Sequence, residues 1–117
     1  MRLDDLAGKI EARILTDSAP AARPVEHVYA GDRISDLLSH ASDTTLLVSN
    51  LSGAPLIRLA DLMDVPAICL VGGQRPEAEF VAAAQSHGTV VMVSPAGMFE
   101  TCGRIYQCLL EAKRVGP

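Results

Sequence analysis

Four short segments rich in glycine, serine and acidic or amide side chains carry the residues that could bind a ligand. Each segment follows an apolar run typical of a strand and precedes apolar residues at helical spacing. Small residues let a ligand approach the backbone, and the free N–H groups at a helix N-terminus favour an anion. The candidate ligand-binding residues in these segments are Asp32, Ser49, Asn50, Ser52, Gly53, Gly72, Gly73, Arg75 and Ser94.

The same residue types also have purely structural roles. Ser and Asp are common N-caps, so Asp32 and Ser52 are predicted to cap the helices that follow them. Gly72 and Gly73 would serve a tight turn from a strand into a helix. At the level of sequence, ligand binding and turn geometry therefore both remain open for these loops.

Catalytic groups do not converge in the sequence. His27, His40 and His87 lie on three different predicted elements, and no Cys or carboxylate stands at metal-ligand spacing from them. No glycine loop continues into Lys-Ser or Lys-Thr, and no Gly-x-Gly-x-x-Gly string occurs, so the common nucleotide-binding motifs are absent. The sequence therefore predicts a non-catalytic protein with no bound metal and no cofactor.

Composition excludes several classes of protein. The chain has 117 residues and a net charge of −4, and only 3% of its residues are aromatic. Acidic balance and scarce aromatics argue against a nucleic-acid partner, because such proteins need cations for phosphates and rings for stacking. No apolar run approaches the ~18 residues of a membrane span, and no signal peptide is recognised at the N-terminus. We therefore expect neither nucleic acid nor a membrane as a partner.

The three cysteines are expected to be reduced thiols inside the core, which predicts a cytoplasmic location. Cys69 lies within an apolar run. Cys102 and Cys108 are six residues apart on one predicted helix, about 600° around its axis, so we expect them on different faces.

The elements that must position the loops alternate along the chain. Strands are predicted at 12–15, 25–29, 44–49, 67–71 and 89–93, and helical apolar stripes at 3–10, 34–41, 56–63, 80–84 and 98–112. Residues 16–24 contain two prolines and are predicted to form a loop. Strands that are apolar throughout are buried on both faces, and their alternation with helices favours βαβ units. We predict a single α/β domain over residues 1–117. It has three layers, with a mostly parallel sheet of four to five strands and helices on both faces.

Ligands of such sheets bind beyond the carboxyl ends of the strands, where all four candidate segments should lie. The order and spacing of segments 28–32, 45–49, 68–73 and 91–95, followed by Phe99, Gly103 and Tyr106, carry a family resemblance. From residue 3 to residue 107, the chain resembles the DRTGG domain family, especially its small stand-alone members. Of the Asp-Arg-Thr-Gly-Gly string that names the family, only Gly72-Gly73 is present.

The resemblance implies a regulatory or assembly module. The family is similar to the N-terminal domain of HPr kinase, and it occurs beside CBS domains and within some phosphotransacetylases. Stand-alone members are associated with iron hydrogenase gene clusters, which implies an accessory role. The resemblance implies no catalytic residues.

Two functions follow as hypotheses. In the first, the chain is a non-catalytic regulatory or accessory domain that binds a small anionic or nucleotide-like ligand. Its high aliphatic content would leave apolar surface exposed, so we also expect self-association into a homodimer. In the alternative, the chain is a protein-interaction module that docks on a redox (hydrogenase-type) or acyl-transfer enzyme and binds no ligand.

Overall fold

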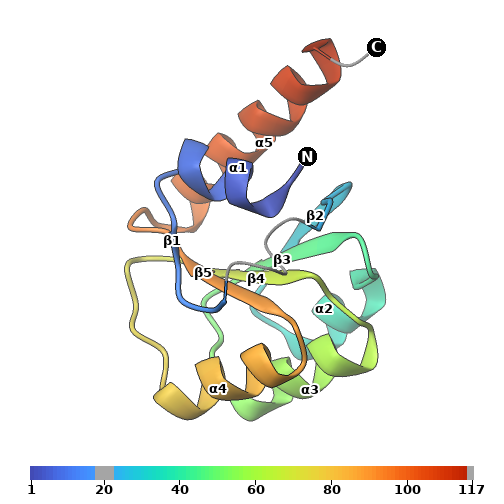
Figure 1. Ribbon diagram of the computed structural model, residues 1–117, viewed down its shortest axis with the longest axis vertical. Helices are drawn as coiled ribbons and strands as arrows, with labels where there is room; N and C mark the ends of the chain where they lie inside the picture. Colours follow the sequence, from blue (N-terminus) through green and yellow to red (C-terminus); the bar gives the residue numbers. More distant parts are fainter. Residues whose placement is uncertain (18–22, 116–117) are drawn as a thin grey trace.

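The computed structural model describes residues 1–17 and 23–115, and this part of the chain folds into one mixed α/β sheet structure (Figure 1). The predicted loop at 16–24 lies partly outside the described residues. The sheet has the strand order β1-β5-β4-β3-β2. Its strands are β1 (Arg13–Ile14), β2 (His27–Ala30), β3 (Thr45–Ser49), β4 (Ala67–Leu70) and β5 (Val90–Val93).

Strands β2 to β5 are parallel and add to the sheet in sequence order. Strand β1 pairs antiparallel with β5, with Arg13 opposite Val93. The prediction of a mostly parallel sheet of four to five strands is therefore confirmed.

Helices cover both faces of the sheet, as predicted (Figure 1). Crossovers between parallel strands are right-handed, so strands that add in one direction place their connecting helices on one face. That face carries α2 (Ile34–His40), α3 (Ala54–Leu62) and α4 (Ala78–Ser86), while α1 (Leu3–Lys9) and α5 (Met98–Val115) pack on the other.

Alternation along the strands divides the core into two parts. In β3, Leu46 and Val48 face α1 and α5, whereas Leu47 faces the α2–α4 layer. Every residue of β3 and β4 is buried, because helices cover both faces of these central strands.

The edge formed by β1 is covered less completely on the α2–α4 side. Helix α4 connects β4 to β5, and no further crossover helix follows on this face. Leu15 and Val93 therefore pack against the core but stay half-buried. Arg13 and Leu15 are two residues apart and point to the same face.

Three local predictions were wrong. The N-cap of α2 is Arg33 and that of α3 is Gly53, and neither makes a side-chain capping bond. Both helices begin one residue too late for Asp32 or Ser52 to cap them. The third wrong prediction is that Cys102 and Cys108 lie on different faces of α5. Both side chains pack against the same core, where Cys108 is buried and Cys102 is half-buried at the margin.

Candidate functional site

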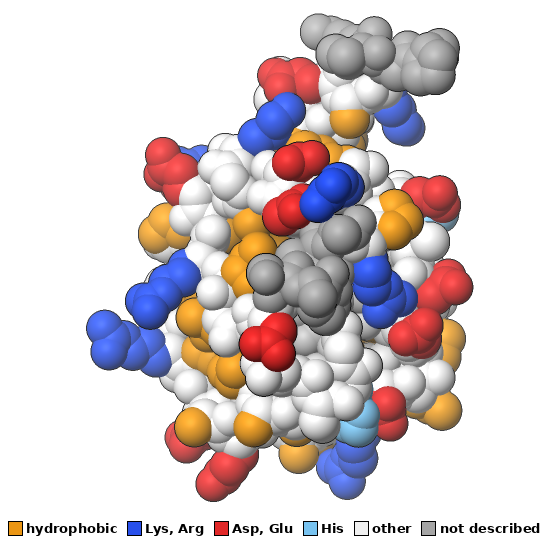
Figure 2. Space-filling view, in the orientation of Figure 1, with side chains coloured by type: hydrophobic (Ala, Val, Ile, Leu, Met, Phe, Trp, Pro, Cys, Tyr) orange, Lys and Arg blue, Asp and Glu red, His pale blue; other side chains and the backbone are white. Residues whose placement is uncertain are grey.

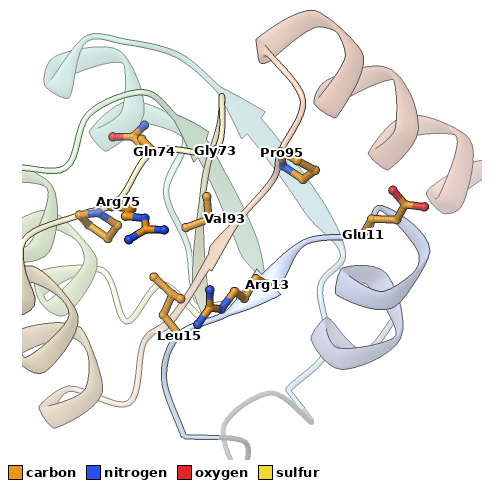
Figure 3. A pocket seen from close by; sticks show the side chains of 9 residues that line it. Glu11, Arg13, Leu15, Gly73, Gln74, Arg75, Val93 and Pro95 are labelled. Carbon is orange, nitrogen blue, oxygen red and sulfur yellow. The ribbon is translucent and has the colours of Figure 1, made fainter.

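A hollow at the carboxyl edge lies between β1 and the loop that joins β4 to α4 (Figure 3). It has a volume of about 600 Å³. In Figure 2, basic side chains project beside hydrophobic ones on the left, where Figure 1 shows this loop. The lining residues are Glu11, Arg13, Leu15, Gly73, Gln74, Arg75, Pro76, Val93 and Pro95.

Two arginines supply the positive charge of this hollow. Arg13 comes from β1 and Arg75 from the β4–α4 loop, and Figure 3 shows both guanidinium groups extending into the same space. Within the described residues, neither guanidinium takes part in an ion pair or a side-chain hydrogen bond. Glu11, the one carboxylate of the lining, lies at the far end of the hollow.

The floor of the hollow is apolar. Leu15 and Val93 lie between the two arginines, and Pro76 and Pro95 complete the wall. An apolar floor with a few charged groups at the rim is the usual composition of a small-molecule pocket. This arrangement suits a ligand with one anionic part and one apolar or planar part.

The conformation of the β4–α4 loop explains how Arg75 is held. Gly72 and Gly73 have φ values of +74° and +65°, which glycine adopts without strain. Their N–H groups donate to the carbonyl oxygens of Ala96 and Ser94 at 2.7 and 2.8 Å. The side chain of Gln74 also donates to the Asn50 carbonyl at 3.4 Å. The loop is thereby tied to both neighbouring loops.

A buried hydroxyl network supports the neighbouring β5–α5 loop. Ser94 and Thr101 are fully buried, and their hydroxyl oxygens lie 2.8 Å apart. The Thr101 hydroxyl donates to the Ala96 carbonyl, and the Ser94 hydroxyl accepts from the Ala96 N–H. Ser49 is likewise fully buried, and its hydroxyl accepts from the N–H of Leu51. These serine hydroxyls shape the loops from inside.

Four further predicted site residues line two smaller hollows. Asp32 and Asn50 line one of about 320 Å³, beside Met98. Ser52 and Gly53 line another of about 280 Å³ between α3 and α4. The hollow beside β1 therefore brings together only two of the residues predicted from sequence, Gly73 and Arg75.

Sequence analysis missed the contribution of β1. Glu11, Arg13 and Leu15 enter the hollow because β1 pairs with β5, which lies about 80 residues further along the chain. The one local signal is the alternation of Arg13 and Leu15 in a short apolar run.

The site offers binding groups rather than nucleophiles or metal ligands. In the part of the chain that the structure describes, no three His, Cys, Asp or Glu side chains gather as a metal site. Burial raises the pKa of the Cys69 thiol to about 12 and also raises the pKa of Cys102 and Cys108. None of these thiols is activated as a thiolate. In addition, no helix of the described residues is long and apolar enough to cross a membrane.

Comparison with known proteins supports the fold. No family model and no curated protein sequence matches the chain. Among solved structures, it is similar to the CBS and DRTGG domains of the regulatory region of Clostridium perfringens pyrophosphatase. The TM-score is 0.74 over 91% of this chain, at 18% sequence identity.

This chain thus has a DRTGG-related fold. It spans 46% of the length of the solved structure that it matches. That pyrophosphatase region is regulatory, and it was solved in complex with an activator, diadenosine tetraphosphate.

Proposed function

We propose that this chain is a non-catalytic, cytoplasmic regulatory or accessory domain that binds a small anionic, nucleotide-like ligand and self-associates. The observation that carries the proposal is the pair of guanidinium groups, Arg13 and Arg75, on opposite walls of one apolar-floored hollow. The regulatory neighbour solved with a dinucleotide activator supports the same class of function.

The proposed ligand carries phosphate groups. Guanidinium groups form short, paired hydrogen bonds with phosphate oxygens, and these are about twice as strong as neutral hydrogen bonds. The floor of Leu15 and Val93 would take a base or another apolar group. The volume of about 600 Å³ falls within the range of ~300–1,000 Å³ that small-molecule pockets occupy.

Binding at this place would couple two parts of the fold. Strand β1 is only two residues long, so the α1–β1 unit is held to the sheet edge by few ladder bonds. A ligand that contacts both Arg13 and Arg75 would strengthen this attachment, since a ligand stabilises the state that binds it. We propose that this coupling turns ligand binding into a regulatory signal.

Titration calorimetry with ATP, tripolyphosphate, adenosine and diadenosine tetraphosphate tests the proposal. ATP and diadenosine tetraphosphate should bind, and tripolyphosphate should bind more weakly because it leaves the apolar floor empty. Arg13→Ala and Arg75→Ala should each weaken ATP binding about 10-fold or more, the cost of a charged hydrogen bond. Glu11→Gln should tighten it, because a carboxylate is removed from the same hollow.

Arg58→Ala is the matched control, because Arg58 is also exposed but lines the hollow between α3 and α4. Its effect on ATP binding should be negligible. If no phosphate compound binds at millimolar concentration, or if Arg58→Ala weakens binding as much as Arg75→Ala, the ligand proposal is wrong. The alternative of a ligand-free module docking on a redox or acyl-transfer enzyme would then stand.

A further inference from the structure

Helix α5 exposes an apolar strip on the side that faces away from the sheet. The side chains of Phe99 and Tyr106 are 94% and 65% exposed, and Leu110 is 36% exposed. The residues of α5 that pack into the core lie on the other side of the helix and are Thr101, Ile105 and Cys108. Exposed aromatics are unexpected in a chain with only four aromatic residues in all.

The strip has a notch at its centre. At about 100° per residue, Phe99, Gly103, Tyr106 and Leu110 fall within a sector of about 60° on the helix. Gly103 is exposed, and a Cβ atom added there would meet no atom within 4 Å. The helix backbone is therefore open to close approach between the two aromatic side chains.

The strip is complementary to itself when two copies of α5 pair antiparallel. With a two-fold axis between residues 104 and 105, Tyr106 lies opposite the partner subunit's Gly103, and Phe99 lies opposite the partner subunit's Leu110. Each large side chain then meets a smaller one, as in knobs-into-holes packing. An isologous contact of this kind closes after two copies.

We propose that this α5 face, made of Phe99, Gly103, Tyr106 and Leu110, is the surface on which a second copy of the chain docks. The inference rests on the self-association part of the proposed function and supplies its surface. The strip itself contains no charged residue, so it brings no like charges together at the centre. Because Phe99 and Tyr106 are exposed, a second copy can reach the strip from outside the fold.

The exposed area of the two aromatic side chains indicates how strongly two copies would bind each other. An aromatic side chain has roughly 200 Å² of surface, so Phe99 and Tyr106 together leave roughly 300 Å² exposed per copy. Two copies would bury roughly 600 Å² from these rings, about half of the smallest stable interfaces. Leu110 and an exposed rim of Glu100, Gln107 and Lys113 must supply the rest. We expect a reversible dimer with a dissociation constant in the micromolar range.

Sedimentation equilibrium of the full chain from about 5 to 500 µM tests the surface. The expected species are a 12.4 kDa monomer and a dimer of twice that mass. Tyr106→Ala and Phe99→Ala should each weaken the dimer about 10-fold or more, as for aromatic residues central to an interface. Leu62→Ala is the control, since Leu62 is 74% exposed on α3, in the layer across the sheet, and should leave the dimer unchanged.

Gly103→Gln separates docking from folding. Glutamine has a higher helix propensity than glycine, so the thermal midpoint of the monomer should rise. The same side chain would fill the notch and weaken the dimer about 10-fold or more. Opposite changes in the two measurements support the proposal.

The outcomes distinguish the surface from the function. A wild-type chain that stays monomeric at 500 µM overturns both the surface and self-association, while ATP binding is measured independently. A dimer that resists Tyr106→Ala and Gly103→Gln overturns the α5 surface and leaves self-association standing. A dimer weakened by Tyr106→Ala but not by Gly103→Gln overturns the antiparallel register.

Discussion

The amino ends and the carboxyl ends of the strands form two edges of the sheet, and these edges use their charged groups differently. At the amino edge, Arg23 forms an ion pair with Asp64 at 3.5 Å and donates to the carbonyl oxygens of Asp43 and Asp64. The His87 imidazole lies 3.1 Å from the Asp61 carboxylate at the ends of α4 and α3. Charges at this edge hold the ends of the elements together.

At the carboxyl edge, the buried bonds between the β4–α4 and β5–α5 loops are made by hydroxyl and backbone groups. Ser94, Thr101 and the backbone of Ala96 form the buried network under the loops. Two outer charges of this edge, Arg13 and Arg75, form no ion pair among the residues that the structure describes.

The difference follows from the connections. The chain leaves β4 toward α4 on one face and leaves β5 toward α5 on the other, so the two loops diverge and a hollow opens beside them (Figure 1). A crevice between diverging loops is where ligands of open α/β sheets bind. Arg23 and His87 at the amino edge are thus paired with carboxylates, whereas Arg13 and Arg75 at the carboxyl edge stay available for the proposed ligand.

The largest effect should come from removing buried hydroxyls at each edge. Thr101→Val should lower the free energy of unfolding by about 2 kcal/mol, because the buried Ser94 hydroxyl loses its acceptor and Ala96 a donor. Thr89→Val at the amino edge removes one bond, to the Val65 carbonyl, and should cost about 1 kcal/mol. Urea denaturation gives both values.

The same two variants test whether only the carboxyl edge supports ligand binding. Thr101→Val should also weaken ATP binding, because the β5–α5 loop supports the glycines of the hollow, whereas Thr89→Val should not. Equal losses of affinity in the two variants would contradict the contrast between the edges.

Cys69, in the central strand β4, predicts how the free energy of unfolding depends on pH. Burial raises the pKa of Cys69 from 9.0 to about 12, so between these values the folded chain holds a proton that the unfolded chain releases. The free energy of unfolding should therefore fall as pH rises above 9, by about 2 kcal/mol at pH 10.5.

Cys69→Ala isolates this effect, since the two proteins differ only in this side chain. The difference in stability between wild type and variant should shrink as the pH rises from 8 to 10.5 in urea denaturation. A constant difference would show that Cys69 does not cause the slope.

A matched pair of glycines gives the smallest and sharpest comparison. Gly72 at the carboxyl edge and Gly88 at the amino edge have φ values of +74° and +76°, and neither would place a Cβ atom within 4 Å of another atom. Gly72→Ala and Gly88→Ala should therefore each cost about 1 kcal/mol of stability through backbone strain alone. Only Gly72→Ala should weaken ATP binding. A similar loss of ATP affinity in Gly88→Ala would show that the two edges do not differ in their effect on binding.

The elements of the fold could be predicted because their signals are local. The apolar run at 67–71 anticipates β4 at Ala67–Leu70, and the stripe at 98–112 anticipates most of α5. Helix starts were less accurate. Asp32 and Ser52 have the right chemistry for caps, but the actual N-caps are Arg33 and Gly53, because α2 and α3 begin further along the chain.

By itself, the sequence determined the alternation of buried strands and helices, and hence which loops share the carboxyl edge. Only the tertiary structure decided which residues of that edge share one hollow. The pairing of Arg13 with Val93 joins segments 80 residues apart in the chain, and no local pattern encodes such a contact. The same holds for α5, whose strip is apolar in sequence like any core face. Which side of a helix meets the sheet is settled by packing, and packing leaves Phe99 and Tyr106 outside.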